Sequence, residues 1–251
     1  MSRLQENWDS RAALNFMLGG AGAGLMLTAG FSSSPAYSIL LSMSLVACGL
    51  GAVWLEIGRK LRALHVFFNP FTSWMTREAF FAVLFFAFAG ISMAFPQFVP
   101  AAALAALAFL YSQARILQAA KGIPAWRAPQ IVPLVVSTGL AEGFGLALFF
   151  DAGLPLLGAF ALAVAARAFA WTRYRAAVKA PALAGAGSTL LRLGTIAALA
   201  LAAAAWAIAG LAPLAGLAAV AAGWQLKFCL VTRAAFKQPF VLPRLPVRGT
   251  K

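Results

Sequence analysis

Two carboxylates, Glu56 and Glu78, stand at the ends of long apolar runs and are the side chains best placed for acid–base chemistry. A carboxyl group near such a boundary is partly shielded from water yet can still exchange protons with it. Burial would raise the pKa of Glu56, and Arg59 nearby would hold that pKa down. Trp74 and Arg77 come shortly before Glu78. This spacing predicts one site, in which Glu56 delivers a proton while the later residues line the site or orient a bound group.

Purely structural interpretations of the same residues are also open. Basic and aromatic side chains are common at membrane interfaces, where they anchor helices without any further role. A Ser or Thr shortly before Glu78 can cap a helix, and Glu78 would then complete a capping box. Arg77 and Glu78 could instead form an ion pair that closes the end of the helix.

Three ionisable residues lie inside apolar runs, where a charge is costly and often functional. Glu142 is roughly 18 Å along the helix from the inner end of its run, at about 1.5 Å per residue. It must be protonated or have a partner. Arg167 could reach inward to form a buried pair with Glu142 or extend its side chain to the membrane surface, and proton transfer through Glu142 is the alternative to a structural pair. Lys227 is expected to extend its long side chain to the membrane surface.

The composition of the chain is that of a membrane protein. Of its 251 residues, 63% are hydrophobic and only 10% are charged, too few to cover a water-soluble domain. The net charge of +14 does not indicate nucleic-acid binding, because the cations punctuate apolar runs instead of forming a basic face. His65 is the single histidine, which excludes a haem held by two histidines, and Cys48 and Cys229 cannot hold an iron–sulfur cluster. No metal, haem or cluster is expected in this chain.

Eight apolar runs, each of about 20 residues, are long enough to cross a bilayer. They are expected over roughly 12–32, 36–57, 78–96, 98–119, 130–150, 153–174, 190–210 and 212–232. The longest connection, Gly58 to Arg77, has 20 residues, so no soluble domain is expected. The sequence predicts an all-α integral membrane protein, a single membrane domain over residues 1–251 built as a bundle of eight transmembrane helices.

The Lys and Arg residues give this bundle an expected orientation. All 20 of them fall at the termini or in and beside the connections on one side. The four connections on the other side, around Ser33, Pro96, Asp151 and Leu211, contain none. Cationic loops resist translocation, and the asymmetry requires an even number of spans. Both termini are therefore expected on the cytoplasmic side of the inner membrane.

The chain resembles a known family in two stretches. The first consists of Glu56-Ile57-Gly58-Arg59 with Arg62, then Asn69-Pro70 and Ser73-Trp74-Met75-Thr76-Arg77-Glu78. It resembles the membrane anchor subunits of DMSO reductase and of the related polysulfide reductase (NrfD-type) proteins. The second, Ile123-Pro124-Ala125-Trp126 after Tyr111 and Arg115, is similar to the loop after their fourth span. The compact length and Trp224-Gln225-Leu226-Lys227 look closest to the membrane subunits of phenylacetyl-CoA:acceptor oxidoreductases.

This resemblance implies a quinone-binding subunit that has no redox centre and no catalytic residue of its own. Such a subunit passes electrons from a ferredoxin-like iron–sulfur subunit to ubiquinone or menaquinone, and a molybdopterin or tungstopterin subunit carries out catalysis. The resemblance places Glu56 where the family has its quinone-site residue at the end of span two, and His65 is the alternative if the alignment slips. The implied quinone-site residues are Glu56, Arg59, Trp74, Arg77 and Glu78.

The partner subunits would dock on the cationic side, where Arg62, His65 and Trp126 are expected to meet them. Because that side is predicted to be cytoplasmic, the substrate of the complex would be cytoplasmic too, such as an acyl-CoA thioester of the phenylacetyl-CoA type. Two other functions remain open. One is a small-solute transporter with a midmembrane site near Glu142 and Arg167, and the other is a purely structural anchor in contact with membrane lipid.

Overall fold

The computed structural model describes residues 4–5, 8–57, 60–178, 183 and 186–237. This part of the chain is helical apart from its turns and one isolated bridge that pairs Leu4 with Phe236. The α-helices are α1 Ser10–Leu14, α2 Gly20–Met26, α3 Pro35–Glu56, α4 Trp74–Ser92, α5 Val99–Ala119, α6 Pro124–Arg127, α7 Ile131–Ala147, α8 Leu154–Ala177, α9 Ala186–Ala205 and α10 Ala212–Phe228. Short 3₁₀ turns and helices are η2 Ala29–Phe31, η3 Lys60–Phe68, η4 Pro96–Phe98 and η6 Ala209–Leu211, and π segments are η1 Asn15–Gly19 and η7 Cys229–Arg233.

Seven helices in the described residues are long and apolar enough to cross a membrane. They cover Ser10–Phe31, Pro35–Glu56, Trp74–Ser92, Pro96–Ala119, Leu154–Ala177, Ser188–Ala205 and Ala209–Arg233. The run expected over 130–150 forms α7, which has only 17 residues because the backbone tightens into a turn at Phe149 and Phe150. The chain is thus a multi-pass helical membrane protein with seven candidate spans and one shorter apolar helix in its described part.

Side-chain caps determine where two of the spans begin. Asp9 accepts hydrogen bonds from the Arg11 backbone N–H at 2.7 Å and from Arg11 Nε at 2.9 Å, and these bonds hold the pKa of Asp9 below its ordinary value. Ser73 Oγ accepts from the Thr76 N–H at 3.3 Å and caps α4. Thr76 therefore occupies the position at which a capping box has its Glu. The prediction that Glu78 completes a capping box is wrong.

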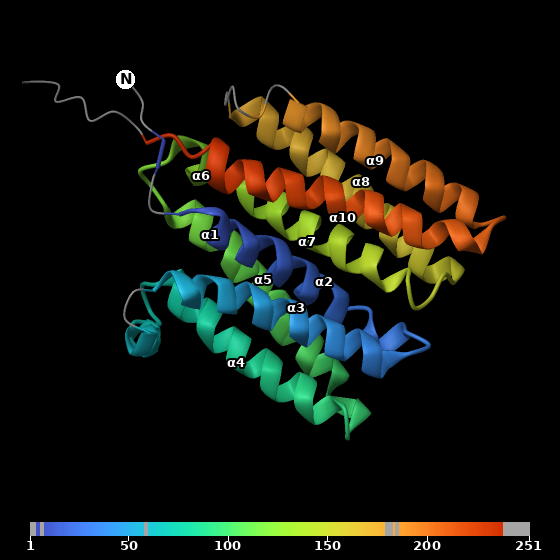
Figure 1. Ribbon diagram of the computed structural model, residues 1–251, viewed down its shortest axis with the longest axis horizontal. Helices are drawn as coiled ribbons and strands as arrows, with labels where there is room; N and C mark the ends of the chain where they lie inside the picture. The colour runs from blue at the N-terminus through green and yellow to red at the C-terminus, as the bar shows by residue number, and fades with distance from the viewer. Residues whose placement is uncertain (1–3, 6–7, 58–59, 179–182, 184–185, 238–251) are drawn as a thin grey trace, which may run out of the picture.

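Close glycine contacts set the distances between α7 and its neighbours. Figure 1 shows α2, α7 and α10 lying side by side in the middle of the bundle. A Cβ added at Gly143 of α7 would collide with the backbone of Gly24 and Leu25, and one added at Gly216 of α10 would collide with the backbone of Gly145. Small residues let helices approach closely in lipid, where van der Waals packing drives their association. The helix that carries Glu142 is therefore packed backbone to backbone on two sides.

The segments that carry Lys and Arg gather at one end of the helices, which we call the cationic end. In Figure 1 the beginning of α1, η3, α6 and the end of α10 lie at the left, and the turns after α2, α4, α7 and α9 lie at the opposite end. Asp151 is the only charged residue in those opposite turns among the described residues. Arg167 and Lys227 are exceptions to the pattern, because both are buried within the bundle.

Candidate functional site

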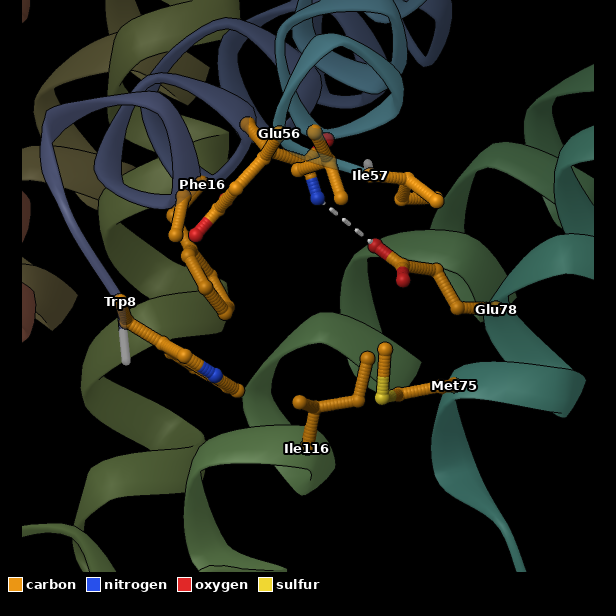
Figure 2. A pocket seen from close by; sticks show the side chains of 10 residues that line it. Trp8, Phe16, Glu56, Ile57, Met75, Glu78 and Ile116 are labelled. Atoms are coloured by element: carbon orange, nitrogen blue, oxygen red, sulfur yellow. Dashed lines mark hydrogen bonds between the residues drawn. The ribbon is translucent and has the colours of Figure 1, made fainter. Parts of the chain in front are cut away.

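A cavity of about 220 Å³ lies at the cationic end between the first four spans. Its wall includes Trp8, Asn15, Phe16, Glu56, Ile57, Met75, Glu78 and Ile116. Figure 2 shows aromatic and aliphatic side chains around an open centre, with Glu56 and Glu78 entering from different helices. Met75 is 49% exposed, so the cavity opens to the surface beside it. The site is therefore an apolar slot with two carboxylates in its wall.

Glu78 is held in this wall by the first span. It is buried, and its Oε1 accepts a hydrogen bond from Asn15 Nδ2 at 3.3 Å (Figure 2). Asn15 begins the π segment η1, and its backbone carbonyl accepts from Gln113 Nε2 of α5 at 3.1 Å. Single π turns within helices occur often at functional sites. Asn15 thus joins three helices around the carboxylate, and its own buried Oδ1 still has no hydrogen-bond partner.

Glu56 is the last residue of α3 and is half-buried at the edge of the cavity. Since α3 ends here, the carboxylate lies where the span meets the cationic end. Glu56 and Glu78 line the same cavity although they lie on different helices. Glu56 is the more exposed of the two and is the better placed to exchange protons with water.

Arg77 does not pair with Glu78, contrary to one interpretation of the sequence. Arg77 Nε donates to the Pro70 carbonyl at 2.9 Å, and a terminal nitrogen donates to the Phe71 carbonyl at 2.6 Å. Consecutive residues on a helix point in different directions, so the two side chains diverge. Arg77 therefore stabilises the turn before α4, whereas Glu78 points into the cavity.

Trp74 is not part of the cavity wall, so the expectation that it lines the slot is also wrong. The guanidinium carbons of Arg77 and Arg115 lie 4.3 Å and 4.5 Å from the centre of the Trp74 ring, and the edge of Tyr111 contacts the same ring. Cations attract the face of an indole ring within about 6 Å. The Trp74 side chain thus contacts two arginines beside the site.

The residues expected to contact partner subunits have different environments. Arg62 and His65 are exposed on η3. Trp126 is 2% exposed, donates from Nε1 to the Leu230 carbonyl at 2.7 Å and packs against Trp8. A docking role for Trp126 is therefore wrong, because its ring is buried in the protein. Arg59, the remaining predicted quinone-site residue, lies outside the described residues.

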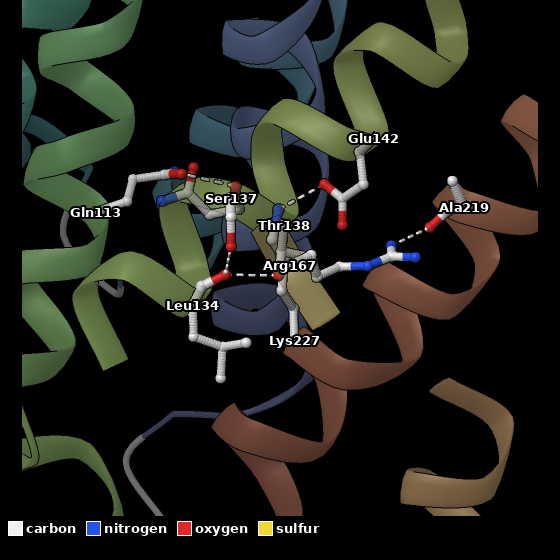
Figure 3. Close-up of polar contacts among 9 residues, drawn as sticks. Gln113, Leu134, Ser137, Thr138, Glu142, Arg167, Ala219 and Lys227 are labelled. Carbon is white, nitrogen blue, oxygen red and sulfur yellow. Dashed lines mark hydrogen bonds and ion pairs between the residues drawn. The ribbon is translucent and has the colours of Figure 1, made fainter. Parts of the chain in front are cut away.

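A second group of ionisable side chains lies deep in the bundle. Lys227 Nζ of α10 donates to Glu142 Oε2 of α7 at 2.5 Å, and Arg167 of α8 lies beside them and donates to the Ala219 carbonyl at 2.7 Å (Figure 3). All three side chains are buried. The pairing of Glu142 with Lys227 was missed, and the expectation that Lys227 extends to the surface is wrong because its ammonium points inward to the carboxylate. The expected pairing of Glu142 with Arg167 is replaced by the bond from Arg167 to Ala219.

Two glycines make room for this ion pair. A Cβ at Gly20 of α2 would collide with the Lys227 ammonium, and a Cβ at Gly223 of α10 would collide with the Glu142 carboxylate. The space is therefore shaped by helices on both sides of the pair. Glu142 Oε1 and Arg167 Nε are buried without a hydrogen-bond partner.

Several residues that complete the cavity were not predicted from the sequence. Asn15 offered a signal, because it is a lone amide within an apolar run. Trp8, Phe16 and Ile116 offered none, because aromatic and aliphatic residues occur along the whole chain. Their role depends on the packing of α1 and α5 against α3 and α4, which periodicity does not reveal.

The cavity has largely apolar walls, and its two carboxylates can exchange protons with a polar group bound between them. The described residues contain no group of three or more His, Cys, Asp or Glu side chains that could hold a metal ion. No known family model matches the chain, and no curated protein sequence is significantly similar to it. The resemblance to the anchor subunits therefore rests on the sequence motifs alone.

Proposed function

We propose that this protein is the quinone-binding membrane subunit of an oxidoreductase complex and passes electrons from an iron–sulfur partner to the membrane quinone pool. The observation that supports this function most directly is the apolar cavity whose wall contains Glu56 and Glu78. Both residues belong to the stretch that resembles the DMSO reductase and polysulfide reductase anchors.

The size and lining of the cavity fit the head group of a quinone. Pockets that enclose drug-sized ligands measure roughly 300–1,000 Å³. A cavity of about 220 Å³ suits one ring, with the isoprenoid tail outside it. Phe16, Ile116 and Met75 supply apolar walls, while the second hydrogen of Asn15 Nδ2 and a protonated Glu78 carboxyl would donate hydrogen bonds to the ring oxygens.

Reduction of a quinone takes up two electrons and two protons and forms two O–H bonds. In this proposal the electrons come from the iron–sulfur subunit, and Glu56 delivers protons from the water at the cationic end. Glu78, held by Asn15, orients the ring. The residues of this chain therefore bind the acceptor and supply its protons, while the partners supply the electrons.

The proposal includes a topology of eight spans, with α7 as the fifth and both termini in the cytoplasm. The support for it is the gathering of cations at the end of the bundle that holds the cavity (Figure 1). The iron–sulfur and molybdopterin or tungstopterin subunits would then dock from the cytoplasm at the inner membrane. Their substrate would be cytoplasmic, such as an acyl-CoA thioester of the phenylacetyl-CoA type.

Photolabelling tests the site without depending on turnover. The full chain in native-like membranes is illuminated with an azido-substituted quinone, and the labelled peptides are identified by mass spectrometry. We expect label on the peptides that contain Trp8 to Phe16, Met75 to Glu78, or Ile116, and we expect excess unmodified quinone to prevent it. The assignment would be overturned if excess unmodified quinone failed to lower the labelling. It would also be overturned if the label were confined to the surroundings of Glu142.

A small-solute transporter with its site near Glu142 is the second candidate. The observation that favours it is that Glu142 Oε1 and Arg167 Nε lack partners in the middle of the bundle. Copurification separates the two functions. A stable complex with iron–sulfur and pterin subunits supports the quinone subunit, whereas a lone chain that takes up a solute independently of quinone supports the transporter.

A further inference from the structure

A groove between α8 and α9 lies apart from the quinone cavity and has no role in the proposed function. It encloses about 430 Å³ near the cationic end, and its wall includes Arg175, Arg192, Ala168 and Ile196. The Arg175 guanidinium lies 5.7 Å from the centre of the Trp171 ring, which also lines the groove. The groove thus has a cationic mouth and a largely apolar floor.

A separate cavity of about 440 Å³ lies farther along the same two helices, where Gly158, Ala161 and Ala202 have small side chains. One leaflet of a bilayer contributes about 15 Å of hydrocarbon, or about ten residues of helix. Ten residues from Arg192 along α9 reach Ala202. The distance along α9 from Arg192 to the second cavity therefore matches the length of one acyl chain.

The position of the groove determines which kind of molecule can enter it. In Figure 1, α9 lies at the edge of the bundle, next to α8 and α10. Only 28% of the most apolar stretch of α9 is buried inside the protein, the smallest share among the seven candidate spans of the described chain. Leu193 and Ile196 are exposed on this helix. In a membrane this face meets lipid, so lipid is the molecule that reaches the groove.

We propose that the groove between α8 and α9 is a binding site for an anionic phospholipid, whose phosphate contacts Arg175 and Arg192 and whose acyl chain lies over Ala168 toward Ala202. Basic pockets between membrane helices attract anionic head groups, with each Arg near the surface contributing to the attraction. The forked guanidinium group matches the phosphate oxygens. The apolar floor provides the second half of the site, which a free phosphate would not use.

Native mass spectrometry of the full chain in detergent tests this proposal. The probes are phosphatidylglycerol and phosphatidylcholine with identical acyl chains. We expect the protein to retain phosphatidylglycerol in preference to phosphatidylcholine. Arg175→Gln and Arg192→Gln should each weaken phosphatidylglycerol binding about fivefold, and together about thirtyfold. Ala168→Leu should displace both lipids, because the larger side chain fills the floor of the groove without changing its charge.

Lys121→Gln is the matched control, since it removes one exposed cation from the same end of the protein but lies away from the groove. This variant should bind phosphatidylglycerol as the unmodified protein does. Equal retention of the two lipids would overturn the proposal. The proposal would also be overturned if both the double arginine variant and Ala168→Leu retained phosphatidylglycerol as the unmodified protein does. The same holds if Lys121→Gln weakened retention as much as the groove variants do. Displacement of the lipid by inorganic phosphate alone would assign the arginines to a free anion instead.

Discussion

Lys227 Nζ donates a hydrogen bond to Glu142 Oε2 at 2.5 Å, and this ion pair joins α10 to α7 with both side chains buried. Separating the partners would leave a charge in a low-dielectric interior, which costs far more than the pair itself contributes. The stability of the pair therefore depends on the packing of the two helices. Replacing one partner should destabilise the protein more than replacing both.

Lys227→Met should lower the free energy of unfolding by about 3–5 kcal/mol, because the Glu142 carboxylate would remain buried without its partner. Adding Glu142→Leu should recover most of that loss, since both charges are then removed. Unfolding in mixed detergent, followed by circular dichroism, measures the difference. Lys237→Met is the control, because Lys237 is exposed at the cationic end. A Lys227→Met protein as stable as the parent would contradict the assigned pair.

Gly143→Ala should destabilise the bundle by about 1–3 kcal/mol, because the added methyl group would collide with the backbone of Gly24 and Leu25. The matched control is Gly90→Ala, since a Cβ at Gly90 in α4 meets nothing within 4 Å. That control should be neutral or slightly stabilising, because alanine favours a helix over glycine by up to about 1 kcal/mol. Thermal unfolding of both variants gives the comparison, and equal effects would argue against close packing of α2 and α7.

Glu56→Gln should lower the rate of quinone reduction by the intact complex by about 100-fold or more, the usual contribution of a proton donor. Glutamine keeps the shape of the side chain but cannot supply a proton. Asp151→Asn is the control, because Asp151 lies in a turn at the opposite end of the bundle. An unchanged rate in Glu56→Gln with the complex fully assembled would count against a protonic role and would favour a purely structural anchor.

Met75→Trp should weaken quinone binding by filling the mouth of the cavity, while both carboxylates remain. We expect a KM for quinone raised by about tenfold or more, which corresponds to the loss of about 1.4 kcal/mol of binding free energy. Met93→Trp provides the comparison, since Met93 is similarly exposed at the far end of α4. If the two tryptophan variants show the same KM, the cavity does not bind the quinone.

Reporter fusions test the orientation. A fluorescent protein that folds only in the cytoplasm, fused after Lys251, should be bright, and an exported phosphatase at the same point should be inactive. The physical basis is that cationic segments resist translocation. The opposite pair of results would place the cavity and its docking surface on the other side of the membrane.

Several features follow from the sequence by itself. Seven of the eight expected runs form helices long enough to cross a membrane, because transfer into lipid depends on the summed hydropathy of about 20 consecutive residues. Glu56 and Glu78 line one cavity, as their positions at the ends of successive runs predicted. Length, composition and position along the chain are local properties, and no knowledge of packing is needed to use them.

The choice of partner for each buried polar group was decided only by the tertiary structure. Glu78 bonds Asn15 and not its neighbour Arg77, and Lys227 bonds Glu142 instead of extending to the surface. Such pairs join residues far apart in the sequence, and a buried charge takes whichever partner the surrounding helices bring within reach. Hydropathy thus determined which segments enter the membrane, whereas close helix packing determined which side chains meet there.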